Sequence, residues 1–139
     1  MKKEDLIGKW KIQREISALD GTPKGKMWGS GFFEIYEGNQ LLYQEQMCHE
    51  TQHEELLFAT KFYRYHFKPE QVLIYFYQEE DERLFMTLPI IDGEFKGHAE
   101  CKSDSYFLQW SWINSSRFLT RYSISGPKKN IIIESEFKR

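Results

Sequence analysis

The side chains with the most chemical potential gather in one short stretch, Gly97–Tyr106, which contains His98, Cys101, Asp104 and Tyr106. A histidine in this setting could act as a general base or as a hydrogen-bonding anchor for a ligand. A histidine on a strand is more often satisfied by its neighbours, so a structural role is the alternative. His98 and Cys101 are three residues apart on a predicted strand, and their side chains therefore point to opposite faces. This spacing argues against a shared metal ion and against a nucleophile–base pair.

Two charged residues occupy faces that are otherwise apolar. Arg14 lies in the alternating stretch Trp10–Ala18, on the face that carries tryptophan, isoleucine and alanine, and Glu45 lies in Leu41–Met47 on the face of leucine, tyrosine and methionine. An inward guanidinium suits the carboxylate or phosphate of a ligand, because its planar fork binds such groups at two points. The alternative is a structural salt bridge between Arg14 and Glu45, since buried charges need partners. The two interpretations are compatible, because such a pair can also anchor a ligand.

Six further residues join Arg14 and Glu45 as candidates, and three of them, Arg64, Arg83 and His98, could also lie on apolar, inward faces. The aromatic ones could line a pocket, but could equally belong to the core or to the outer surface of a sheet. No motif identifies a catalytic residue: a nucleophile elbow, a zinc-protease motif, a phosphate loop and a dinucleotide fingerprint are all missing. The predicted ligand-binding residues are Arg14, Glu45, Arg64, Arg83, His98, Asp104, Tyr106 and Trp110.

The sequence offers one other possible metal-ligand cluster, Cys48, His49 and His53. Glutamates and a glutamine surround these residues, as is typical of a solvated connection between strands. We therefore expect no metal site and no resident cofactor.

The elements that must position these residues are short strands. Each stretch of alternating or apolar residues is followed closely by a turn signal such as Asp-Gly, Gly-Asn or Lys-Pro, and no apolar stripe has the helical period. Glycines at 25, 29 and 31 predict bends or bulges that curl a sheet. Consecutive strands joined by short turns form an antiparallel meander, which avoids exposed edges by closing on itself. The expected fold is all-β: an up-and-down barrel of about ten strands, forming one domain over residues 1–139 and wide enough to leave an interior cavity.

Composition narrows the classes of function. Aromatic residues make up 17% of the chain, which favours strands, and the formal net charge of −2 is spread along it. A nucleic-acid groove or a polybasic membrane patch is therefore not expected. No apolar run is long enough for a signal peptide or a membrane span. With two widely spaced cysteines, we expect reduced thiols in a cytoplasmic protein that is a monomer or a weak homodimer.

Several stretches together resemble a small family catalogued as domain of unknown function 6314. The resemblance spans nearly the whole chain and is most specific in the histidine-to-tyrosine stretch and the glycine-proline-lysine loop. It implies a calycin-like barrel, similar in architecture to lipocalins and fatty-acid-binding proteins, and it brings no established activity. The chain departs from the family pattern at Met86, where a histidine is usual. The matching pieces are Leu6–Trp10, Arg14, Leu42–Glu45, Phe62–Tyr65, Arg83–Phe85, His98, Cys101, Asp104, Tyr106, Gly126–Lys129 and Arg139.

Three functions fit these observations. The first is a protein that holds a small, partly apolar, anionic ligand inside the barrel. The second is an enzyme of the isomerase or cyclase kind that uses His98 in the interior, and the third is an interaction module whose barrel is filled by side chains. A haem-binding barrel is weakly supported, because no histidine follows His98. We favour the binding protein.

Overall fold

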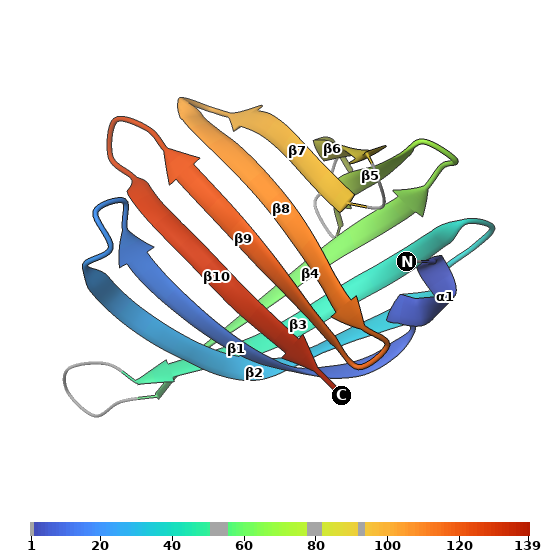
Figure 1. The fold of residues 1–139 in the computed structure, drawn as a ribbon, viewed down its shortest axis with the longest axis horizontal. Coiled ribbons are helices and arrows are strands. Elements are labelled where there is room, and N and C mark those ends of the chain that lie inside the picture. Colours follow the sequence, from blue (N-terminus) through green and yellow to red (C-terminus); the bar gives the residue numbers. More distant parts are fainter. Residues whose placement is uncertain (1, 51–55, 78–81, 92–93) are drawn as a thin grey trace.

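The computed structural model describes residues 2–50, 56–77, 82–91 and 94–139. Within them the chain forms a one-turn helix and ten antiparallel strands that close into a barrel (Figure 1). The predicted all-β barrel is confirmed, with one element, the short helix, that the sequence did not indicate. The elements are α1 (Lys3–Leu6), β1 (Gly8–Ala18), β2 (Pro23–Ile35), β3 (Gln40–Glu50), β4 (Leu56–Phe67), β5 (Gln71–Phe76), β6 (Leu84–Ile91), β7 (Glu94–Cys101), β8 (Asp104–Asn114), β9 (Arg117–Ser125) and β10 (Asn130–Lys138).

Each strand pairs with its neighbour in sequence, and the ring is closed by β1 pairing with β10 as well as with β2. Opposite register positions place Arg14 of β1 beside Ser135 of β10 and Met27 of β2. The register is continuous at Gly29 and Gly31, and the shift in the β1–β2 pair lies near Gly25, between Ile16 and Ser17. Only the first of the three glycines therefore lies at a distortion of this pair.

One end of the barrel is sealed by apolar and aromatic side chains. Leu6 of α1 and Trp10 of β1 are fully buried, and the Trp10 indole donates a hydrogen bond to the carbonyl of Leu6 over 2.8 Å. The Arg139 guanidinium stacks on the Trp10 ring at 4.1 Å and donates to the carbonyl oxygens of Asp5, Ile7 and Ser115. The C-terminal end of the chain thus holds the helical plug against the barrel.

Strand β4 is paired unequally on its two sides within the described residues. This strand pairs with β3 along its whole length, whereas β5 pairs only with Tyr63–Phe67. Figure 1 shows β4 extending well past the short strand β5. The segment Leu56–Lys61 has no strand partner on that side among the described residues. Among the described residues, this side of β4 is therefore unpaired at the end of the barrel opposite the plug.

No helix in the described part of the chain combines the length and apolarity needed to cross a membrane.

Candidate functional site

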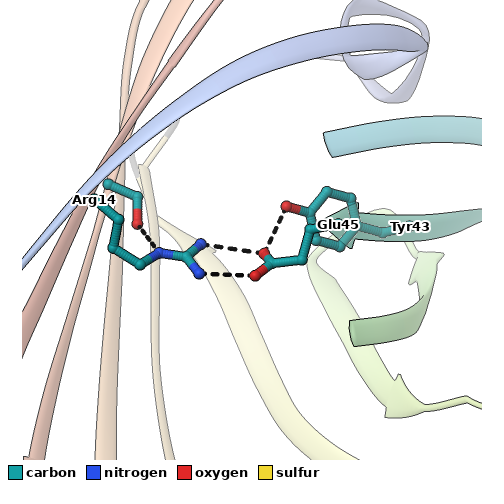
Figure 2. Close-up of polar contacts among 4 residues, drawn as sticks. Arg14, Tyr43 and Glu45 are labelled. Carbon is teal, nitrogen blue, oxygen red and sulfur yellow. Dashed lines mark hydrogen bonds and ion pairs between the residues drawn. The ribbon is translucent and has the colours of Figure 1, made fainter. Parts of the chain in front are cut away.

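An ion pair lies inside the barrel, between Arg14 of β1 and Glu45 of β3 (Figure 2). The guanidinium donates two hydrogen bonds to the carboxylate, of 2.7 Å and 3.1 Å, and only 13% of the Arg14 side chain and 6% of the Glu45 side chain are exposed. This two-point geometry is the strong form of the arginine–carboxylate interaction. The predicted pairing of Arg14 with Glu45 is confirmed.

Two neighbours complete the polar cluster. The Tyr43 hydroxyl donates to Glu45 over 2.8 Å, and the Arg14 Nε donates to the Ser135 hydroxyl over 2.7 Å (Figure 2). Gly31 explains how Tyr43 fits: a Cβ at this position would lie 2.9 Å from the Tyr43 ring. The missing side chain on β2 leaves room for the tyrosine that orients the carboxylate.

The charges of the pair are held in place by each other. Burial alone would raise the pKa of Glu45, but the hydrogen bonds and charge of Arg14 outweigh it and hold that pKa below its ordinary value. Burial would likewise lower the pKa of Arg14, and Glu45 reverses that shift. Both groups are therefore charged at neutral pH, and together they carry no net charge.

A cavity of about 90 Å³ adjoins this cluster and is lined mostly by aromatic side chains. Burial raises the pKa of Tyr63 to about 12 and raises those of Tyr65 and Tyr122 as well, so all three hydroxyls stay protonated near neutral pH. Among the described residues, these hydroxyls have no hydrogen-bond partner, although Tyr65 is only 6% exposed. The cavity therefore presents hydroxyl groups that can hydrogen-bond to an occupant.

A wider hollow of about 450 Å³, the mouth, lies beside the end of β4 that begins at Leu56 and shares part of its lining with the cavity. The rings of the mouth are in contact: Phe85 stacks with Tyr63 at 6.1 Å and meets Phe76 at 4.7 Å. Lys61, the cross-strand neighbour of Glu45 in the β3–β4 pair, stands where the two spaces meet. The residues shared by the cavity and the mouth are Lys61, Tyr63, Phe85 and Tyr106.

Four of the eight predicted ligand-binding residues line the interior: Arg14, Glu45, Tyr106 and Trp110. Tyr106 belongs to both the cavity and the mouth. Trp110 stacks on Phe118 at 4.7 Å, so one ring is both part of the core and part of the cavity wall.

The prediction that the side chains of His98 and Arg64 point into the barrel is wrong. His98 is on the outer face of β7, where it packs on Phe107 and lies 2.8 Å from the Glu100 carboxylate, with 46% of its side chain exposed. Arg64 pairs with Glu82 at 2.9 Å and covers the ring of Tyr75. Both positions follow from the alternation of strands, since the neighbours of these residues in sequence face inward.

Arg83 and Asp104 lie near the open end but outside the cavity lining. The Arg83 guanidinium sits 4.8 Å from the centre of the Phe76 ring. Asp104 packs against Gly126, where a Cβ would come within 1.9 Å of its carboxylate. That contact accounts for the glycine of the Gly126–Pro127 turn.

The sequence-based list missed Tyr43, Lys61, Tyr63, Tyr65 and Tyr122, all of which line the cavity. The available signal was alternation, because Lys61, Tyr63 and Tyr65 are two residues apart on β4 and must share a face. That signal is weak here, since aromatic side chains occur on both faces of the strand.

No group of potential metal ligands occurs among the described residues, and His53 of the cluster considered above lies outside them. A hollow of about 720 Å³ lies over β1, β2 and β8–β10; its walls include Gln13, Glu15 and Trp28, and it shares Arg14 and Thr120 with the lining of the interior cavity.

The fold and its interior site define a closed, calycin-like antiparallel β-barrel. The chain belongs to the family of unknown function DUF6314, which it matches over residues 6–139. No curated protein matches the sequence.

Similar solved structures share the fold at low identity. An S-type phycobiliprotein lyase, CPES, from Guillardia theta has a TM-score of 0.73 at 8% identity, over 99% of this chain and 89% of that one. A protein of unknown function from the DUF3598 family of Nostoc punctiforme has a TM-score of 0.69 at 14% identity, and this chain spans 49% of its length. A redesigned β-barrel bound to DFHBI has a TM-score of 0.51 at 11% identity, over 99% and 97% of the two chains.

Proposed function

We propose that this protein binds a small, partly apolar, anionic molecule in the barrel interior and its mouth. The observation that carries the proposal is a pair of adjoining hollows: an aromatic-lined cavity beside the Arg14–Glu45 pair shares four wall residues with a mouth of about 450 Å³. A space of that volume falls within the range of small-molecule sites, which are mostly apolar with a few placed polar groups.

The solved structures lend support of a general kind. They include a phycobiliprotein lyase and a redesigned barrel bound to DFHBI. At identities of 8% and 11% the likeness concerns the fold alone. The proposal takes from it only that a barrel of this kind can bind a small molecule, as the redesigned barrel binds DFHBI. His98 has no part in the proposal, because its side chain is on the outer face.

Native mass spectrometry of the freshly purified protein, before and after denaturing extraction, tests the proposal. A bound mass that extraction releases would support it and would give the class of ligand. A protein that carries no added mass, and takes up nothing from a panel of fatty acids, tetrapyrroles and acyl conjugates, would instead favour a barrel filled by its own side chains.

The proposal includes a cytoplasmic location and a monomeric or weakly dimeric state. Both cysteines, Cys48 and Cys101, are free thiols, as is usual in a reducing compartment. Cell fractionation and light scattering after size-exclusion chromatography test these two points.

A further inference from the structure

The inner cavity and the mouth differ in the size of group that they can hold. An apolar cavity of about 150 Å³ is known to take one benzene molecule, and a water occupies about 30 Å³ in the liquid. The inner cavity, of about 90 Å³, is therefore too small for a ring but large enough for a hydroxyl, a carbonyl or an amide group. A ring of a ligand can therefore lie only in the mouth, and the inner cavity can take at most a small group.

The inner cavity does not favour an anionic tip. Both nitrogens of the Arg14 fork already donate to Glu45, and the Nε donates to Ser135. A carboxylate placed there would lose its hydration and would meet the buried negative charge of Glu45 as closely as the positive charge of Arg14. A neutral polar tip meets no such opposition and finds the hydroxyls of Tyr63, Tyr65 and Tyr122.

The mouth has a different charge. Lys61 lies on its wall, and its positive charge helps to lower the pKa of Glu45 across the strand pair, although no carboxylate of the described residues lies within ion-pairing distance of its ammonium group. Because Lys61 is exposed, an anion bound there would keep part of its hydration. The Lys61 side of the mouth is thus the place in this site where an anionic group can meet an exposed positive charge and stay partly hydrated.

The walls of the mouth select for shape. Phe85 packs edge-on against Tyr106 at 5.4 Å and nearly parallel to Tyr63, and Phe62 and Phe76 complete an aromatic lining. Aromatic rings in such offset and edge-on arrangements favour a flat, conjugated partner over a flexible chain.

From these features we infer that the ligand is a flat aromatic or conjugated carboxylic acid bound in one orientation. Its carboxylate pairs with Lys61, and its rings lie against the aromatic walls of the mouth. This inference rests on the proposed function and assigns Lys61, rather than Arg14, as the anion-binding residue.

The test uses 6-hydroxy-2-naphthoic acid and its primary amide, two fluorescent probes that differ only in the charged group. Dissociation constants are measured by fluorescence titration for the wild type, for Lys61→Gln and for the control Lys11→Gln. The control removes the same charge from the exposed outer face of β1.

We expect the wild type and Lys11→Gln to bind the acid about fivefold more tightly than the amide, the range of an exposed ion pair. In Lys61→Gln the two probes should bind equally. If both probes bind but the preference for the acid persists in Lys61→Gln, or is missing in the wild type, the assignment of Lys61 is wrong while the proposed function stands. If neither probe binds at millimolar concentration, both the inference and an interior site for flat ligands are wrong.

Discussion

The Arg14–Glu45 pair allows one stability prediction to be worked out in detail. In Glu45→Gln, the side-chain oxygen can keep the contacts now made at Oε1, which come from Arg14 and Tyr43. The new amide nitrogen then faces the other Arg14 nitrogen, at a site where that nitrogen now donates over 2.7 Å. Two donors meet, and a buried cation loses its counter-charge.

Breaking a buried pair from one side costs about 3–5 kcal/mol, because the remaining charge is left without compensation. The free energy of unfolding of a domain is about 5–15 kcal/mol, so Glu45→Gln should lose a large part of the total. Urea unfolding followed by tryptophan fluorescence measures this loss directly.

Two variants serve as controls. Glu15 and Lys26 form an exposed pair at 3.8 Å, and Glu15→Gln should change stability by less than about 0.5 kcal/mol. The double variant Arg14→Met/Glu45→Leu removes both charges and should be more stable than Glu45→Gln, since apolar residues of similar volume can replace a buried pair. A loss below about 1 kcal/mol in Glu45→Gln would show that the pair is hydrated rather than buried, and the reasoning above would fail.

Three further predictions concern the same interior and the sealed end. The pKa of Glu45 in the folded protein lies below its ordinary value of 4.5, so the unfolded chain binds a proton at this carboxylate first as the pH falls. The free energy of unfolding of the wild type should therefore decrease as the pH falls below about 4.5, and that of Glu45→Gln should decrease less. Urea midpoints measured across pH 3–7 test this difference. Gly31→Ala should displace Tyr43 from Glu45 and cost about 1–3 kcal/mol in urea unfolding; an unchanged midpoint would mean that the ring has room to move. Arg139→Ala should lower the free energy of unfolding by about 1–2 kcal/mol, because it removes hydrogen bonds to backbone carbonyls and the stacking on the Trp10 indole. Amide hydrogen exchange should also become faster in residues 3–7. Exchange as slow as in the wild type would contradict the role of Arg139 in holding the helix.

The fold and the Arg14–Glu45 pair could be predicted from the sequence, because side chains along a strand alternate between its two faces. Arg14 and Glu45 each stand on a face whose other members are apolar, so both the inward direction and the need for a partner were visible. The antiparallel order of neighbouring strands could be predicted as well, because turn residues separate the short strands.

The outward positions of His98 and Arg64 were not predicted, for two different reasons. Around Arg64 the run Phe62–Tyr65 is aromatic on both faces, so hydrophobicity gives no contrast between inside and outside. Around His98 the neighbours Gly97 and Ala99 are small and mark the interior only weakly.

The one-sided pairing of β4 among the described residues was beyond sequence reasoning for another reason. It depends on where β5 stops pairing and on the register shift between Ile74 and Tyr75 in the β5–β6 pair. Such features are set by contacts between strands rather than by the residues of any one strand.

Closure between β1 and β10 has a consequence for the order of folding. Arg14 and Glu45 are 31 residues apart, and a sheet of the first three strands can already bring them together. Arg14 and Ser135 are 121 residues apart, so that bond waits until β10 has been synthesised and a long loop has been closed. On the ribosome, β1 therefore keeps an unpaired backbone edge through most of translation, which is the period when the nascent chain is most open to pairing with another copy.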